Sequence, residues 1–262
     1  MHHVGTIIRK QLASPTVMVL ELKVPTLSSF LPGQWVDFMV PPHSWIGGFS
    51  IASSPKDLPN LTLAIKRSSH PPAAWVHESS HVNQDVHVQV GGTCVLPPLD
   101  SSTTTTEEFA ASPPRIFCAG GIGISPVLSQ YREFLSQRSA HWTPTSPGPA
   151  ARFLYTVSLP SELVFADELA ELARKGKAQN PHDQMIFSLT LASKWEEGAV
   201  KLYPGVELKI GRVMKIFLDN CSYKEDCIYY LCGPPAMLDD ATTHLADRRG
   251  VDPKLIQYEI WW

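Results

Sequence analysis

The residues of this chain with the clearest chemical capacity form a glycine-rich stretch, Cys118-Ala119-Gly120-Gly121-Ile122-Gly123-Ile124-Ser125-Pro126. It follows an apolar run that predicts a buried strand, and it precedes apolar residues at three- and four-residue spacing, which predict one face of a helix. At a helix N-terminus, a glycine turn can bind an anion, because unpaired backbone N–H groups point toward it and the helix dipole favours negative charge. The stretch therefore predicts a diphosphate-binding turn, and the alternative is an ordinary glycine-rich turn. The residues assigned to this turn are Gly120, Gly121, Gly123, Ile124, Ser125 and Pro126.

A second glycine turn lies near the end of the chain. The apolar run of residues 228–231 leads into Cys232-Gly233-Pro234-Pro235-Ala236-Met237. Together the two turns resemble those of the ferredoxin–NADP reductase superfamily. There a GGxGxxP turn holds the diphosphate of a nicotinamide dinucleotide, and a CGPxxM turn borders the nicotinamide. The resemblance covers nearly the whole chain and implies cofactor contacts by Cys232, Gly233, Pro234, Pro235 and Met237.

Cys232 receives a catalytic role from this resemblance, because the superfamily places the cysteine of this turn beside nicotinamide C4. Its expected contribution is the packing and polarity of the hydride path rather than nucleophilic attack. The alternative is a buried cysteine at a strand end, since free cysteines are commonly buried.

The flavin motif of the superfamily is altered in this chain. Its RxYS segment supplies an arginine to the flavin phosphate, a tyrosine to the isoalloxazine and a serine near flavin N5. The aligned residues here are Gly47-Gly48-Phe49-Ser50, so the charge-assisted, bidentate arginine contact is missing. The resemblance implies flavin contacts by Phe49, Ser50 and Ile51, with a catalytic role for Ser50. The alternative for Phe49 is a plain aromatic residue of the barrel core.

A second flavin-phosphate segment of the superfamily, Gly-x-x-Ser before a short helix, aligns with His70-Pro71-Pro72-Ala73 and lacks both the glycine and the hydroxyl. Lys66, at a predicted strand end nearby, is expected to replace the lost charge. Each lost charged hydrogen bond is worth about 1.5–3 kcal/mol, so flavin binding is expected to be weak or exchangeable, with FAD favoured over FMN. Gly47→Arg is expected to tighten binding if the loop has the geometry of the superfamily.

Trp262, the last residue, is expected to stack on the flavin, because superfamily members often end in an aromatic that covers the ring. The alternative is that Trp261 and Trp262 only seal an interface. A narrower resemblance, to a vertebrate branch of the superfamily, includes this Trp-Trp end. It also rests on Gly47-Gly48-Phe49-Ser50-Ile51, His70-Pro71-Pro72 and Trp75-Val76-His77.

The choice of dinucleotide depends on cations near the adenosine ribose, because the 2′-phosphate of NADP needs them. Residues 155–158, after the second predicted strand of the nucleotide-binding half, supply none. Ser193, Lys194, Lys201 and Tyr203 only weakly resemble the SR…KxY set of relatives that use NADP. We therefore favour NAD and leave NADP open.

One motif points to different chemistry. His77-Glu78-Ser79-Ser80-His81 matches the HExxH pattern, in which two histidines bind zinc and the glutamate is a base. The candidate helix is short, and the nearest further carboxylates, Glu107 and Glu108, lie in a low-complexity segment. We therefore expect no metal site.

The elements that must position these residues divide the chain in two. Residues 1–98 show short strand patterns separated by proline and glycine, which predicts a closed antiparallel barrel of the flavin-binding type. Residues 99–114 are rich in serine and threonine and predict a linker or hairpin. Residues 115–262 alternate strand and helix patterns, which predicts a Rossmann-like parallel α/β domain that binds NAD(P) at the carboxyl ends of its strands.

Composition excludes several classes of protein. The net charge of −3, with no basic stripe, argues against nucleic acid as a partner. No apolar run reaches the length of a membrane span. The five cysteines form no CxxC pair, which argues against a disulfide framework, a zinc ribbon or a ferredoxin-type cluster. The chain as given shows no signal peptide or transit segment.

These observations predict a flavin-dependent oxidoreductase that transfers hydride between NAD(P)H and a flavin at the domain interface and passes electrons to an acceptor that the sequence does not identify. The alternative is a dinucleotide-binding sensor or scaffold with a degenerate flavin site. The resemblance implies a mitochondrial location. Oligomeric state is not predicted.

Overall fold

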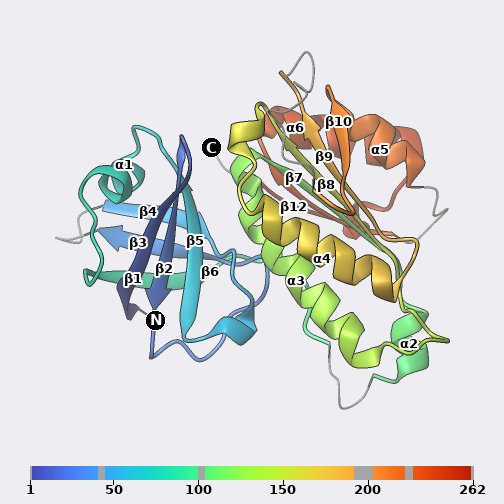
Figure 1. The fold of residues 1–262 in the computed structure, drawn as a ribbon, viewed down its shortest axis with the longest axis horizontal. Helices are drawn as coiled ribbons and strands as arrows, with labels where there is room; N and C mark the ends of the chain where they lie inside the picture. Colours follow the sequence, from blue (N-terminus) through green and yellow to red (C-terminus); the bar gives the residue numbers. More distant parts are fainter. Residues whose placement is uncertain (1, 41–44, 100–103, 192–202, 222–226, 261–262) are drawn as a thin grey trace.

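Two six-stranded sheets, lying end to end along the long axis of the molecule, make up most of the chain in the computed structural model (Figure 1). The structure describes residues 2–40, 45–99, 104–191, 203–221 and 227–260. No helix in these ranges combines the length and apolarity needed to cross a membrane.

The first sheet is antiparallel and closes into a barrel. Its spatial order is β4-β3-β6-β1-β2-β5, and an antiparallel bridge between Ile51 and Leu63 joins the segment after β4 to β5. Along β3, Val36 and Phe38 point inward and their neighbours outward, the alternation expected of a strand with one buried face. The predicted antiparallel barrel is therefore confirmed. Its elements are β1 (His3–Ser14), β2 (Val17–Lys23), β3 (Trp35–Val40), β4 (Trp45–Ser50), β5 (Asn60–Lys66), α1 (Pro71–Glu78) and β6 (Asp85–Gly91).

The second sheet is entirely parallel, in the order β10-β9-β8-β7-β11-β12, and has helices on both faces. Alternate residues of each strand enter different cores: Phe117 packs beneath α3 and α4, whereas Cys118 packs against α5 and α6. The predicted parallel α/β fold is confirmed. Its strands are β7 (Arg115–Gly120), β8 (Ala151–Val157), β9 (Gln184–Leu189), β10 (Glu207–Ile210), β11 (Ile228–Gly233) and β12 (Ile256–Ile260). Its main helices are α3 (Ile124–His141), α4 (Ala166–Gln179), α5 (Met214–Asn220) and α6 (Pro235–Thr243).

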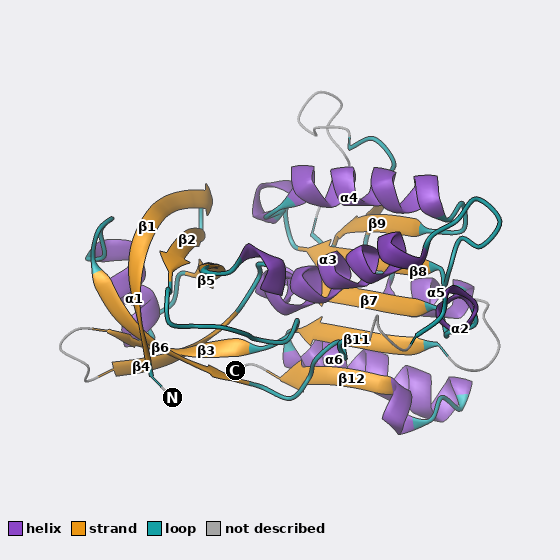
Figure 2. Ribbon diagram, turned by 90° about the horizontal axis from the view of Figure 1, so that it is seen from below, coloured by secondary structure: helices purple, strands orange, loops and turns teal. Residues whose placement is uncertain are grey.

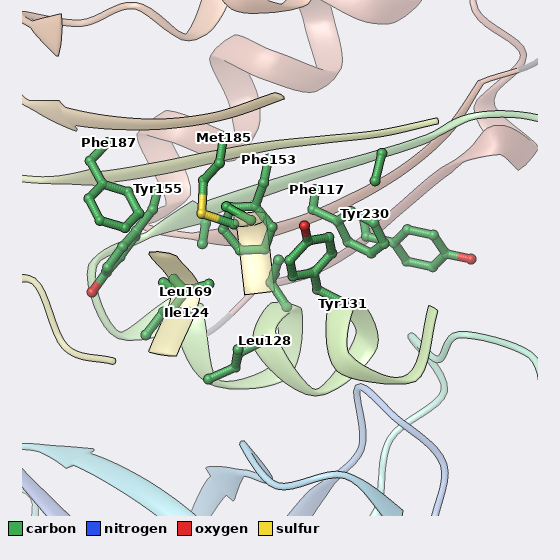
Figure 3. Packing of buried hydrophobic residues seen from close by; sticks show 14 of the residues in the cluster. Phe117, Ile124, Leu128, Tyr131, Phe153, Tyr155, Leu169, Met185, Phe187 and Tyr230 are labelled. Carbon is green, nitrogen blue, oxygen red and sulfur yellow. The ribbon is translucent and has the colours of Figure 1, made fainter. Parts of the chain in front are cut away.

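Aromatic residues fill the core between the parallel sheet and helix α3, as Figure 3 shows. The Phe117 ring stacks on Tyr230 of β11 with 5.4 Å between centroids, and Tyr131 of α3 meets it edge-on at the same distance. Rings of this size bury large apolar areas, so this core fixes the position of α3 on the sheet. The N-terminus of α3 is thereby held at the end of β7.

Two segments differ from the sequence-based expectations. Helix α3 reaches His141, five residues beyond the end at Ser136 that the sequence pattern predicts, because the buried Arg138 in its last turns is paired with Asp183 at 2.6 Å. Residues 106–110 form a short helix, α2 (Thr106–Ala110), with a capping box between Thr105 and Glu108, inside the segment expected to be a linker or hairpin. The domain limits at residues 98 and 115 stay a prediction.

Polar side chains of α3 fix the barrel against the parallel sheet. The Ser129 hydroxyl donates to the Ser53 carbonyl at 2.7 Å, and the Arg132 guanidinium donates to the Ala52 carbonyl at 2.6 Å. The Gln130 amide donates to the carbonyl of Cys94 at 2.9 Å. In this arrangement the carboxyl ends of the parallel strands face the barrel, as their arrowheads show in Figure 2.

Candidate functional site

A cavity of about 490 Å³ lies where the carboxyl ends of the parallel strands meet the barrel. Ligands of open α/β sheets bind at this edge, so the cavity is the candidate site. Its walls come from both halves of the molecule. The barrel contributes Thr16, Val17 and Lys66, and the turn at the end of β7 contributes Gly120, Gly121 and Ile122. The end of β8 and the segment after it contribute Thr156, Val157, Ser158, Glu162 and Val164. The remaining lining residues come from later in the chain: Thr190, Arg212, Val213, Met214, Lys215, Pro234, Ala236, Met237 and Asp240.

The two glycine turns, far apart in the sequence, lie side by side at this cavity. Strands β7 and β11 are parallel neighbours, with Cys118 opposite Leu231 and Ala119 opposite Cys232. Parallel neighbours end at the same edge of a sheet, so the turns that follow them meet. The sequence predicted both turns, and the strand order brings them together.

Packing between the turns explains three of the glycines. A Cβ at Gly120 would lie 2.6 Å from the Met237 sulfur, and one at Gly233 would collide with the Met237 methyl group. A Cβ at Gly123 would collide with the carbonyl oxygen of Cys232. These glycines and Met237 therefore hold the two turns in contact, and their first role in this structure is packing.

Gly121 is different, because it faces open space. Its φ is +54°, in the left-handed region that favours glycine, and a Cβ there would have no atom within 4 Å. The 3-10 turn Gly121–Gly123 leads directly into α3, and the Ile124 N–H donates back to the carbonyls of Gly121 and Ile122, so the open approach is at Gly121 itself. This is the place in the turn where an anion can approach the backbone.

The remaining residues of the turn occupy distinct positions at the start of α3. Ile124 is fully buried in the aromatic core, so its side chain anchors the helix. Pro126 lies in the first helical turn, where its missing N–H removes no hydrogen bond. The Ser125 side chain is only 1% exposed, and its hydroxyl has no hydrogen-bond partner. A buried polar atom without a partner is rare, so this hydroxyl is available to a bound group.

Three cationic side chains line the cavity. Lys66, expected beside a flavin phosphate, projects from the end of β5 into the same cavity as Gly121. Arg212 and Lys215 lie beyond β10, and Lys215 is paired with Asp240 at 3.3 Å. Sequence reasoning missed Arg212 and Lys215 because it did not predict the short strand β10. The only signal was two basic residues flanking the start of a predicted helix.

Cys232 lies behind the turn, on the side of the sheet that faces α3. Its thiol is 3% exposed and does not belong to the cavity lining. Burial raises the pKa of this thiol, and the nearby Glu259 carboxylate and Cys94 raise it further. The thiol therefore stays protonated, as the expected packing role requires.

Glu259 is a second residue that sequence reasoning missed. It lies on β12 directly opposite Cys232, and residues paired in parallel strands share a face of the sheet. The same carboxylate helps to raise the pKa of Cys94, with burial as the larger cause, to about 12. The only signal in the sequence was an acidic residue inside an otherwise apolar final strand.

The flavin motif lies on β4, away from the lining of the cavity. Phe49 packs edge-on against Phe38, with 5.6 Å between ring centroids, and is partly buried against the barrel core. Ser50 pairs with Trp35 across the ladder, and Ile51 is fully buried in the core. The structure therefore turns Phe49 and Ile51 toward the barrel core, opposite the inward-pointing Val36, and leaves Ser50 on the outer face beside Trp35.

The expectation that Gly47→Arg tightens flavin binding conflicts with this structure. A Cβ at Gly47 would lie 2.8 Å from Cβ of Pro72 and 3.1 Å from the tip of the Phe49 ring. Contacts that short are not tolerated by rigid neighbours, so the loop geometry differs from the one that the expectation assumed.

Other motif residues have structural positions or lie outside the described ranges. His77 Nε2 is 2.9 Å from the Ile65 carbonyl in the barrel core, so the first histidine of the HExxH match is a buried packing residue. Of the residues considered for NADP, Tyr203 packs edge-on against Phe187 at 5.3 Å. Five residues considered in the sequence analysis lie outside the described residues: Trp261, Trp262, Ser193, Lys194 and Lys201.

Comparisons with known proteins agree with this architecture. The model of the oxidoreductase NAD-binding domain family matches residues 117–243. The chain is 33% identical over 257 residues to oxidoreductase NAD-binding domain-containing protein 1 of Bos taurus, covering 95% of this chain and 77% of that protein. It is 29% identical over 236 residues to the reductase component of propane 2-monooxygenase of Mycolicibacterium goodii, covering 90% of this chain and 60% of that protein. The crystal structure of the cytochrome P450 reductase GcoB of Amycolatopsis shares the fold, with a TM-score of 0.76 at 19% identity over 99% of this chain and 69% of that one.

Proposed function

This chain belongs to the family of oxidoreductase NAD-binding domain-containing protein 1, and we propose that its cavity binds a nicotinamide dinucleotide for hydride transfer at the interface with the barrel. The observation that carries the proposal is the open backbone turn at Gly121, which opens into the same cavity as the Lys66 side chain. Exposed N–H groups at a helix N-terminus together with a cation favour a diphosphate.

The strand order suggests how the dinucleotide lies. With the diphosphate at the end of β7, the nicotinamide extends toward β11 and the adenosine toward β8, β9 and β10. Strands are about 4.8 Å apart, so β10 ends about 14 Å from β7, a distance suited to the adenosine half. Thr156, Thr190 and Arg212 line that side of the cavity. NAD is the proposed dinucleotide, and NADP is the alternative.

The nicotinamide end is the proposed place of hydride transfer. A flavin held between the barrel and this end would supply the hydride-accepting chemistry. The residues of this chain then have local roles: Cys232, behind the turn, supports the proposed path with an uncharged side chain, because its buried thiol stays protonated. Glu259 holds a carboxylate beside that wall, and Ser50 offers a hydroxyl from the barrel.

A flavin is implied by the fold, and the residues present fit it poorly. Phe49, the residue aligned with the stacking tyrosine, packs edge-on against Phe38 and faces the barrel core, so its ring is not presented to a ligand. The phosphate-binding residues of the superfamily are replaced by Gly47, His70 and Ala73. That loss favours the second candidate function, a dinucleotide-binding sensor or scaffold without reductase activity.

The electron acceptor is proposed to be a separate molecule, which the described residues do not identify. A mitochondrial location is proposed from the family resemblance, and imaging of the tagged protein in cells tests it. Neither proposal alters the assignment of the cavity.

Titration of NADH and NADPH, followed by nucleotide fluorescence, tests the central proposal. Gly121→Ala places a methyl group where the diphosphate approaches, and Lys66→Ala removes a cation; each is expected to weaken binding about five- to tenfold. Lys23→Ala, at the end of β2 and outside the cavity lining, is the matched control and should bind as the wild type does. Unchanged affinity in folded Gly121→Ala and Lys66→Ala proteins would overturn the assignment.

A further inference from the structure

The barrel supplies one wall of the cavity at the strand ends. This barrel wall consists of Thr16, Val17 and Lys66, at the start of β2 and the end of β5. Val17 is opposite Lys66 in the antiparallel ladder of these strands. The next residue, Arg67, donates its N–H to the Thr16 carbonyl at 2.7 Å. The backbones of Thr16 and Lys66 therefore lie close together, and both residues line the cavity.

An apolar contact holds the barrel wall against the parallel sheet. Val17 and Ala64 of the barrel pack against Val164, which follows β8. None of these three residues is more than 5% exposed. Ile122, in the middle of the glycine turn after β7, packs against the same cluster. The barrel wall is therefore beside the ends of β7 and β8, where the diphosphate and the adenosine ribose are proposed to lie, and not beside the nicotinamide end at β11.

The Thr16 hydroxyl is a buried polar group in this wall. Its oxygen is shielded from solvent, and no described residue forms a hydrogen bond with it. Buried polar atoms without partners are rare, because leaving one unpaired costs free energy. A hydroxyl both donates and accepts hydrogen bonds, so this group suits the phosphate oxygens or the ribose hydroxyls of a nucleotide.

Lys66 is the cation of the barrel wall, and the two carboxylates of the cavity have other partners. The Glu162 carboxylate accepts hydrogen bonds from two backbone N–H groups of its own loop, each at 3.1 Å. Asp240 is paired with Lys215 at 3.3 Å. Lys66 makes no ion pair with the residues that the structure describes. Its ammonium group is therefore available to a phosphate.

We infer that the barrel binds the ADP-ribose half of the dinucleotide directly, through the Thr16 hydroxyl and the Lys66 ammonium group. The bound nucleotide then bridges the two halves of the molecule, with the glycine turn on one side and the barrel wall on the other. The inference rests on the proposed function, because it adds Thr16 to the same site and specifies which half of the dinucleotide the barrel contacts.

Calorimetric titration of the full chain with ADP-ribose and with NADH tests the inference. Thr16→Val keeps the shape of the side chain and removes its hydroxyl, so it should weaken both ligands by a similar factor of about three to ten. Thr62→Val is the matched control: it makes the same change on β5, outside the cavity lining, and should leave both affinities unchanged. A loss for NADH without a loss for ADP-ribose would overturn the inference, because the barrel would then contact the nicotinamide half.

Thermal unfolding of the ligand-free protein shows whether the Thr16→Val protein is intact. Because the hydroxyl has no partner in the described structure, its replacement by a methyl group should not lower the unfolding temperature. A lower unfolding temperature would mean that the hydroxyl already has a partner within the protein, which would contradict the inference. A folded Thr16→Val protein with unchanged affinity for both ligands would contradict it as well.

Hydrogen exchange, followed by mass spectrometry, tests the bridge itself. ADP-ribose should slow exchange in the barrel peptides that cover residues 14–19 and 62–68, as well as in the turn at residues 120–126. The peptide of α1, which contributes nothing to the cavity lining, should exchange at an unchanged rate. Protection confined to the turn would show that the nucleotide does not reach the barrel.

The same titrations separate a failure of the inference from a failure of the proposed function. If Gly121→Ala weakens NADH binding and Thr16→Val does not, the inference fails and the dinucleotide site stands. If the wild-type chain binds neither NADH nor ADP-ribose, the proposed function fails and the inference fails with it.

Discussion

The end of β7 and the corner between β4 and α1 are both places where a strand delivers the chain to a helix N-terminus, and they have opposite surroundings. After β7, Gly121 faces open space, and no side chain caps the start of α3. At the barrel corner, Pro72 covers Gly47 and the first turn of α1 begins with two prolines. A helix dipole is present in both places, but of the two only the first leaves room for a phosphate to approach the backbone.

This difference shows that a glycine in a motif can have different structural roles. Gly121 leaves room for a ligand, whereas Gly123 leaves room for the carbonyl of Cys232 and Gly47 leaves room for Pro72. Glycines alike in the sequence therefore leave open space in one place and permit close packing in another.

The largest effect is expected from Gly123→Ala, which distinguishes the packing glycine from the binding glycine. The new methyl group meets a backbone carbonyl that cannot move aside, so the free energy of unfolding should fall by about 3 kcal/mol. Gly121→Ala is the matched control: its methyl group meets nothing, and only the left-handed backbone costs about 1 kcal/mol. Urea unfolding measures both, and equal losses would contradict the distinction.

Gly47→Arg tests the barrel corner directly. Because the side chain must displace Pro72, we expect a loss of about 1–3 kcal/mol in unfolding free energy and no gain in FMN affinity. Thermal unfolding and calorimetry give the two values. Tighter FMN binding at unchanged stability would show that the corner opens easily.

Arg212→Ala tests whether the part of the cavity beyond β10 recognises the 2′-phosphate of NADPH. Arg212 is exposed, so its contact with that phosphate is worth at most about 1 kcal/mol, which corresponds to a loss of up to fivefold in NADPH affinity. NADH affinity should stay within error. Fluorescence titration with both nucleotides measures the ratio, and an equal loss for NADH would place Arg212 elsewhere on the dinucleotide.

The smallest effect is expected at the nicotinamide end, from Glu259→Gln. The carboxylate helps to raise the pKa of the Cys232 thiol, so removing its charge lowers that pKa. Burial, the larger cause, is unchanged, so the pKa stays above its ordinary value. Alkylation of Cys232, followed by peptide mass spectrometry from pH 7 to 10, should become modestly faster at the upper end. A slower rate would reverse the assigned sign.

The sequence by itself determined the features that depend on neighbouring residues. Strand and helix periodicity predicted the antiparallel barrel and the parallel α/β fold, and both are confirmed. The glycine turn at residues 120–126 was predictable because free N–H groups and backbone freedom follow from a few adjacent residues. Residue types also showed that the flavin arginine is missing at Gly47.

Only the tertiary structure decided which of these residues meet. Cys232 and Glu259 face each other because β11 and β12 are neighbours, and Lys66 joins the cavity at the strand ends because α3 fixes the barrel against the sheet. The contact of Pro72 with Gly47, which closes the barrel corner, likewise joins two elements that are separated along the chain. Such contacts arise from strand order and long-range packing, and the local periodicity of a sequence does not contain that information.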